Sequence, residues 1–133
     1  MPTPVELVER LYGRWNAGAL ADAEDVVDPA VELLQDPLVP NAATLHGREG
    51  WRCWAARWGE RYEDLRITPD AVVRIDAEHV LAFVSIAATP VGAQRPLTWA
   101  AAHVWTVRAQ RIAGWQAHLD LDAVRATLDA PDG

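Results

Sequence analysis

Two runs of alternating residues near the C-terminal end constrain the fold more than any other feature of the sequence. From Leu97 to Leu119 the chain reads as two long strands joined by a short polar segment, which predicts a β-hairpin. Alternation along the first strand places Trp99, His103 and Trp105 on one face and small alanines on the other. We therefore expect this hairpin to close a compact domain around an apolar cavity.

The order of the remaining elements predicts an α+β fold. Thr3 and Glu6 are spaced as a capping box ahead of residues that recur at helical spacing as far as Trp15. Further helices are expected over residues 20–27 and 48–62, a short strand over 30–35, strands over 66–75, 80–88, 97–107 and 112–119, and a last helix over 121–128. Because the helices come first and the strands follow, we predict helices packed on one face of an antiparallel sheet, in one domain spanning residues 1–133.

Charge and cysteine content narrow the classes of function. The 133-residue chain carries a formal net charge of -7, and all of its basic residues are arginines scattered along the sequence. Such a surface repels phosphate backbones and anionic membranes, so no nucleic-acid or membrane partner is expected. The lone Cys53 offers no internal disulfide, and the chain does not start with a signal-peptide pattern, so we expect a cytoplasmic protein.

Seven tryptophans are the unusual part of the composition. Trp51, Trp54, Trp58 and Tyr62 recur at helical spacing and form one aromatic face of the expected third helix. An aromatic face of this kind is more often plain core than the wall of a ligand site. Tryptophans on several elements nevertheless leave gaps between them, which favours a cavity.

Five short motifs in succession resemble a known family. They are WNAG at residues 15–18, DPAVE at 28–32, HGREG at 46–50, HVWTV at 103–107 and RIAGW at 111–115. In order and spacing they are similar to the SnoaL-like branch of the NTF2-like superfamily, over nearly the whole chain. The resemblance implies a cone in which a curved antiparallel sheet is wrapped by three N-terminal helices, with a short C-terminal helix and a pocket inside. It does not imply one reaction, because the superfamily includes cyclases, isomerases, epoxide hydrolases and non-catalytic proteins.

Two of these chemistries can be compared residue by residue. Asp36, followed by proline, resembles the general base of ketosteroid isomerases, whose oxyanion-hole positions fall here at Leu11, next to Tyr12, and at His103. The catalytic positions of limonene epoxide hydrolases resemble places occupied here by Val84, Ile86 and Ala117, none of which moves a proton. We therefore expect no epoxide hydrolysis by that mechanism.

Three residues are candidate catalysts, each with a structural alternative. His103 in an aromatic cavity would titrate near neutrality and exchange protons, or it would be an ordinary core histidine. Asp36 would be a partly desolvated base, or the first residue of a surface turn. Asp120 is the nearest candidate for the late aspartate that acts as acid and base in SnoaL-type cyclases, or it is the N-cap of the last helix.

The expected ligand-binding walls are aromatic and apolar: Tyr12, Trp15, Trp54, Trp58, Trp99, Trp105 and Leu119. No metal site is expected, because Asp36, His46 and His103 lack the short spacing of metal ligands, and no cofactor is expected because glycine-rich phosphate loops are absent. If the alanines of the hairpin face outward, a second copy of the chain would cover them, which predicts a homodimer.

Two functions remain open at this point. The first is a cofactor-free acid–base enzyme, an isomerase or polyketide-cyclase-like protein that removes a proton beside the carbonyl of a small apolar molecule. The alternative is a non-catalytic pocket protein that binds such a molecule. The apolar residues Leu11, Val84, Ile86 and Ala117 at catalytic positions of relatives favour the alternative.

Overall fold

The computed structural model describes residues 2–34, 44–122 and 124. It contains two α-helices, one 3-10 helix and six strands in these ranges. The expected α+β class is confirmed, but the helix count is lower than the sequence predicted.

Helix α1 (Pro4–Asn16) begins as its sequence predicts. The Thr3 hydroxyl accepts a hydrogen bond from the Glu6 amide at 3.1 Å, which satisfies one of the free amides of the first turn. The buried side of α1 consists of Leu7, Val8, Leu11, Tyr12 and Trp15. The helix ends at Asn16, whose side-chain amide donates to the Ile67 carbonyl at 2.7 Å and accepts from the Ile67 amide at 2.7 Å.

The expected second helix is wrong. Only a 3-10 helix, η1 (Ala23–Val26), forms there, and the chain continues directly into strand β1 (Val27–Leu34). Leu20 and Ala23 are buried in the core all the same, so their spacing signalled burial and not an α-helix.

Strand β2 (Leu45–His46) leads into helix α2 (Gly47–Arg61), which ends one residue earlier than predicted. Tyr62 has extended backbone angles and opens strand β3 (Tyr62–Arg74). The aromatic face of α2 is therefore Trp51, Trp54 and Trp58. The buried Trp51 indole donates to the Leu20 carbonyl at 3.0 Å and so holds α2 against the turn before η1.

The other strands are β4 (His79–Pro90), β5 (Leu97–Arg108) and β6 (Arg111–His118). All the strands form one sheet in the order β2-β1-β6-β5-β4-β3. The predicted hairpin is present as the antiparallel pair β5 and β6, with His103 opposite Ala117 and Trp105 opposite Trp115. The sheet is not purely antiparallel as expected, because β1 runs parallel to β6.

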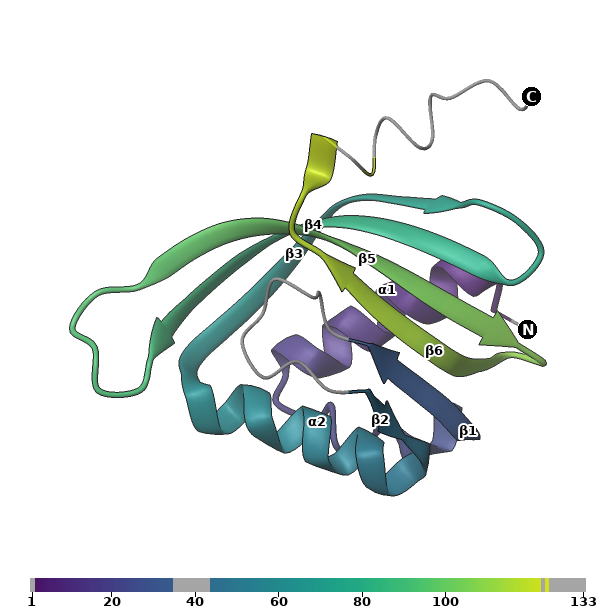
Figure 1. Cartoon of the computed structure of the whole chain (residues 1–133), viewed down its shortest axis with the longest axis horizontal. Coiled ribbons are helices and arrows are strands. Elements are labelled where there is room, and N and C mark those ends of the chain that lie inside the picture. Colours follow the sequence, from purple (N-terminus) through teal and green to yellow (C-terminus); the bar gives the residue numbers. More distant parts are fainter. Residues whose placement is uncertain (1, 35–43, 123, 125–133) are drawn as a thin grey trace.

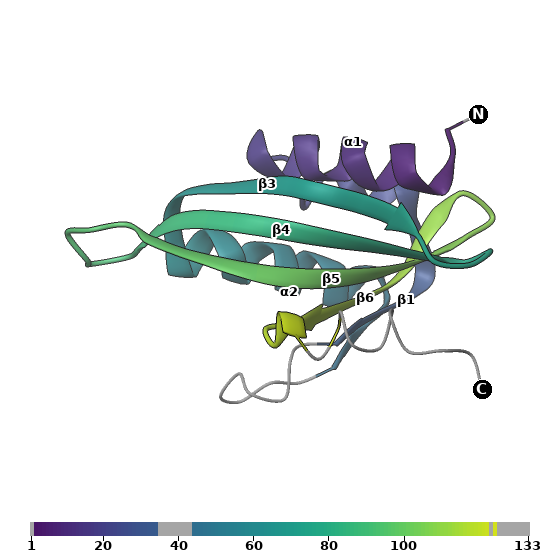
Figure 2. The ribbon, with the colours of Figure 1, turned by 90° about the horizontal axis from the view of Figure 1, so that it is seen from above.

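The sheet is strongly curved and does not close. Figures 1 and 2 show both helices on the same side of the curve, α1 along β3 and α2 next to β1 and β2. The concave face and the helices enclose one hydrophobic core, in which Trp51, Trp54 and Trp105 are the largest fully buried side chains.

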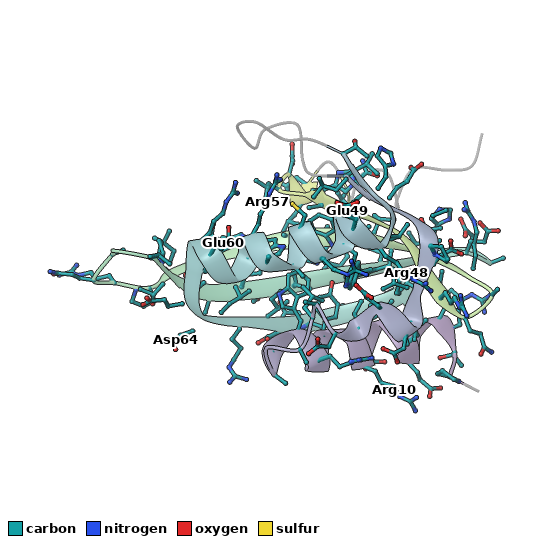
Figure 3. All side chains as sticks on the ribbon, turned by 90° about the horizontal axis from the view of Figure 1, so that it is seen from below. Arg10, Arg48, Glu49, Arg57, Glu60 and Asp64 are labelled. Atoms are coloured by element: carbon teal, nitrogen blue, oxygen red, sulfur yellow. The ribbon has the colours of Figure 1, made fainter. Side chains whose placement is uncertain are left out.

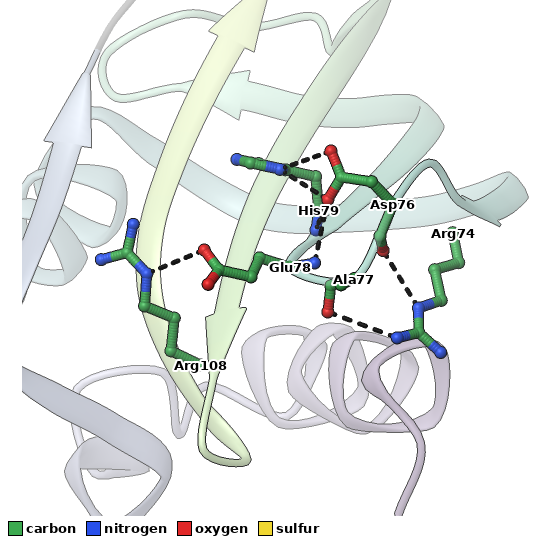
Figure 4. Close-up of polar contacts among 6 residues, drawn as sticks. All are labelled: Arg74, Asp76, Ala77, Glu78, His79 and Arg108. Atoms are coloured by element: carbon green, nitrogen blue, oxygen red, sulfur yellow. Dashed lines mark hydrogen bonds and ion pairs between the residues drawn. The ribbon is translucent and has the colours of Figure 1, made fainter.

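The opposite end of the sheet is fixed by polar contacts around the β3–β4 turn (Figure 4). The Asp76 carboxylate accepts from the Glu78 and His79 amides at 2.9 Å each and contacts the His79 ring at 2.8 Å. Glu78 accepts from Arg108 of β5 at 3.0 Å. Because these contacts are exposed to solvent, we expect them to set the shape of the turn and to add little to the free energy of unfolding.

The predicted C-terminal helix falls largely outside the described residues. Residues 121, 122 and 124 are helical, and the Val124 amide donates to the Asp120 carbonyl at 3.3 Å. Within the described ranges, no helix is both long and apolar enough to cross a bilayer.

Candidate functional site

Three side chains from distant parts of the chain meet in the core and form a hydrogen-bonded group. Tyr12 comes from α1, and His103 and Trp105 come from β5. The Tyr12 hydroxyl lies 2.7 Å from His103 Nδ1 and accepts a hydrogen bond from Trp105 Nε1 at 2.9 Å. All three side chains are fully buried, so the bonds between them are shielded from water.

The surroundings fix the protonation of this group. Burial lowers the pKa of His103 to about 3, and the nearby His118 acts in the same direction, so the imidazole is neutral at pH 7. Burial also raises the pKa of Tyr12, which therefore keeps its proton, although the bond from Trp105 acts in the opposite direction. Since Trp105 Nε1 only donates, the Tyr12 proton is directed to His103 Nδ1. His103 then carries its own proton on Nε2.

His103 is also part of the wall of a cavity of about 590 Å³. The lining residues come from α2, the start of β3, β4, the β5–β6 hairpin and Leu119: Trp54, Arg57, Trp58, Arg61, Tyr62, Ile86, Leu97, Thr98, Trp99, Ala100, Ala101, His103, Trp115, Ala117 and Leu119. Trp54, His103 and Trp115 are buried, while Arg61, Leu97 and Thr98 are exposed. The cavity thus has a closed, aromatic end at His103 and an open end toward solvent.

The structure divides the expected wall residues into two groups. Trp54, Trp58, Trp99 and Leu119 line the cavity. Tyr12, Trp15 and Trp105 do not line it and lie behind it in the core, with Trp15 packed on Trp54 and Trp58 at ring distances of 5.1 and 5.3 Å. The contribution of Tyr12 is therefore to orient His103 and not to form the wall.

The three candidate catalysts are not equally placed. His103 lines the cavity. Asp120 is exposed and is not among the described lining residues, and its carbonyl accepts from Val124 as an N-cap residue does. Asp36 lies outside the described residues.

Arg57, Arg61 and Trp115 line the cavity but were not among the site residues predicted from the sequence. The two arginines lie one turn apart on α2, at helical spacing from Trp54 and Trp58, so extending the aromatic face along the helix would have found them. Trp115 follows from the alternation of β6, which also places Ala117 inward. Its ring packs against Trp54 at 4.8 Å and against His103 at 5.2 Å.

Of the three positions at which the family resemblance led us to expect the catalytic groups of epoxide hydrolases, two lie in the wall of this cavity. They are occupied by Ile86 and Ala117, which supply only apolar surface. Among the described residues, no three His, Cys, Asp or Glu side chains lie close enough to share a metal ion.

The outward face of β5 bears on the expected dimer. Ala100 is exposed, but Ala102 is fully buried within a single chain. Less of the alanine surface is therefore free for a second copy than the alternation suggested.

Comparison with known families places this architecture. The sequence profile of the SnoaL-like domain matches residues 8–115. The chain belongs to the SnoaL-like family, whose fold is the NTF2-like cone described above.

Solved structures with this fold cover nearly the whole chain. An NTF2-like protein of unknown function from Burkholderia pseudomallei K96243 has a TM-score of 0.78 at 18% identity, over 98% of this chain and 100% of its own. A hypothetical protein with a ketosteroid isomerase-like fold from Catenulispora acidiphila DSM 44928, in complex with trimethylamine, has a TM-score of 0.73 at 24% identity, over 98% of this chain and 96% of its own. A putative SnoaL-like polyketide cyclase from Jannaschia sp. CCS1 has a TM-score of 0.72 at 17% identity, over 98% of this chain and 98% of its own. No match was found among curated proteins.

Proposed function

We propose that this SnoaL-like protein binds a small, largely apolar molecule in the tryptophan-lined cavity and that His103 donates a hydrogen bond from Nε2 to an oxygen of that molecule. The observation that carries this proposal is the 2.7 Å hydrogen bond between Tyr12 and His103 Nδ1, which holds a neutral imidazole at the closed end of the cavity. A volume of about 590 Å³ lies within the range of small-molecule sites.

Unsatisfied donors in the wall support binding of an oxygen-bearing molecule. The indole N–H groups of Trp54 and Trp115 are buried and have no hydrogen-bond partner among the described residues. Buried donors in native proteins normally find an acceptor. We propose that an oxygen of the ligand supplies one.

Tryptophan fluorescence tests the proposal, because four tryptophans line the cavity. Titration with steroids, terpenes and aromatic polyketides is expected to change the emission saturably for at least one class. Ala117→Phe fills the cavity and is expected to abolish that response, while Gln116→Phe, on the other face of β6, is the matched control. A flat response to the whole panel, or a saturable response that Ala117→Phe leaves intact, would contradict binding in this cavity.

Acid–base catalysis is the second candidate, and one observation favours it. A neutral imidazole with a fixed N–H donor is what a site needs to stabilise the negative oxygen formed when a proton leaves the carbon beside a carbonyl. The same fold occurs in a putative polyketide cyclase. In this scheme Asp36 is the base that removes the proton.

Exchange of carbon-bound protons separates the two candidates. If the protein is such an enzyme, the methyl protons of 2-acetonaphthone exchange with D2O faster in its presence than in buffer, as measured by NMR. Asp36→Asn and His103→Ala are each expected to remove the acceleration. Exchange at the buffer rate, for a ketone shown to bind, would leave the non-catalytic function.

A further inference from the structure

The open end of the cavity carries two cations that nothing in the described protein neutralises. Arg57 and Arg61 lie one turn apart on α2 and both line the cavity. Arg14, Arg52 and Arg108 each form an ion pair with a carboxylate, but no hydrogen bond or ion pair joins the guanidinium of Arg57 or Arg61 to another described residue.

The rest of the described wall does not offset this charge. No Asp or Glu is among the described lining residues, and apart from the tryptophans the other polar side chains of the described wall are Tyr62, Thr98 and the neutral His103. Glu60, Glu63 and Asp120 are exposed and are next in sequence to residues of the wall, but they are not among the described lining residues. The charged side chains that line the described part of the cavity are therefore the two arginines.

From this arrangement we propose that the ligand of the cavity is an anion: a flat apolar body carrying a carboxylate or an ionised enol, whose negative oxygens are held by Arg57 and Arg61. The inference rests on the proposed binding function and names the class of molecule bound. Guanidinium groups match carboxylate geometry with paired N–H donors. Trp54, Trp58 and Trp99 supply flat surfaces for an aromatic body.

The two ends of the cavity also fix the direction of the ligand. The anionic group lies at the open end beside the arginines, where it stays partly hydrated. A neutral oxygen at the far end of the molecule accepts a hydrogen bond from His103 Nε2. A ligand of this class thus carries oxygen acceptors at both ends of an apolar body.

A cationic ligand is the main competitor, since tryptophan rings also attract cations. A related structure was solved in complex with trimethylamine. In this chain a cation at the open end would face two guanidinium groups and no described carboxylate, so the same aromatic wall selects for the opposite charge.

Three naphthalene probes of similar shape test the charge: 2-naphthoate, neutral 2-acetonaphthone and the 2-naphthylmethylammonium ion. Isothermal titration calorimetry of the full chain at pH 7.5 is expected to give a Kd for 2-naphthoate roughly tenfold lower than for the ketone, with the ammonium ion weakest. Raising the salt concentration should narrow the gap between the anion and the ketone.

Two variants assign the selectivity. The double change Arg57→Gln and Arg61→Gln is expected to weaken 2-naphthoate about tenfold and to leave the ketone within about twofold. Arg10→Gln removes one positive charge from α1, on the opposite side of the molecule from Arg57 in Figure 3, and should alter the Kd of neither probe.

The outcomes separate this inference from the binding function. If the ketone or the ammonium ion binds as tightly as 2-naphthoate, or if the double variant keeps the preference for the anion, the anionic ligand is wrong while binding in the cavity stands. If none of the three probes binds, the proposed binding function fails with it.

Discussion

The hydroxyl of Tyr12 satisfies two ring nitrogens at once, and this makes it the residue on which the site depends most. It accepts from Trp105 Nε1 and donates to His103 Nδ1. Without it, both nitrogens would be buried without a partner, and either ring nitrogen of His103 could carry the proton. The hydroxyl oxygen of Tyr12 therefore contributes to the stability of the core and also determines that His103 carries its proton on Nε2.

Tyr12→Phe should consequently destabilise the protein. We expect the free energy of unfolding to fall by about 1–3 kcal/mol, because the buried donor and acceptor lose their partner. Urea denaturation followed by circular dichroism measures the change. Tyr62→Phe, at a half-buried tyrosine, is the control and should cost less than about 0.5 kcal/mol. Equal losses for the two variants would show that the hydroxyl of Tyr12 is not special.

Acidification should weaken the fold through His103. Its folded pKa is about 3, below the ordinary value of 6.5, so between these values the unfolded chain binds one proton more than the folded chain. Stability is then fully present above pH 6.5 and falls as the pH drops, by up to about 1.4 kcal/mol per pH unit from this residue. Other acidic groups add their own dependence.

The contribution of His103 is isolated by comparison with His103→Gln, whose amide oxygen still accepts from Tyr12. Unfolding free energies measured between pH 7.5 and 5 should fall more steeply for the wild type than for the variant. Parallel curves would mean that His103 is protonated in the folded state over this range.

Among the secondary-structure elements, the end of α1 has the tightest link to the sheet. Asn16 bonds to both the amide and the carbonyl of Ile67, as a neighbouring strand would. These two hydrogen bonds join residues that are 51 positions apart in the sequence. They also hold Tyr12, which lies one turn earlier on α1, against β5.

Asn16→Ala should therefore loosen α1 from β3. We expect a loss of about 1–3 kcal/mol in unfolding free energy and faster hydrogen exchange at the Ile67 amide, which loses its acceptor. NMR hydrogen exchange measures the second effect residue by residue. An unchanged exchange rate at Ile67 would contradict the role of this bond, whatever the change in global stability.

The assembly of the whole molecule is a further prediction. The outer side of β5 presents the half-buried Val104 and Thr106. We propose that a second copy covers this surface. Light scattering after size-exclusion chromatography should give the mass of a dimer at micromolar concentration, and Val104→Glu should shift it to the monomer. A monomeric mass for the wild type would rule out this homodimer.

Alternation and helical spacing predicted those elements whose one-sided burial leaves a periodic pattern in the sequence. The β5–β6 hairpin, α1 with its Thr3 cap and most of α2 follow from such patterns. The same rule misled at residues 20–27, because Leu20 and Ala23 are buried from a turn and a 3-10 helix. It also gave no sign that β1 runs parallel to β6, since the direction of pairing between distant strands leaves no local pattern.

The sequence alone was enough for the fold family and for the inward direction of His103, because both follow from local periodicity and ordered motifs. Only the tertiary structure could show that Tyr12 bonds to His103, that Trp105 and Trp15 lie behind the cavity, and that Arg57 and Arg61 line its open end without a partner. These facts depend on distances between α1, α2 and β5, which are set by how the helices pack into the curved sheet. The β5–β6 hairpin thus supplies His103. Helix α1 supplies Tyr12, which determines the ring nitrogen that carries the proton, and α2 supplies the two arginines at the open end.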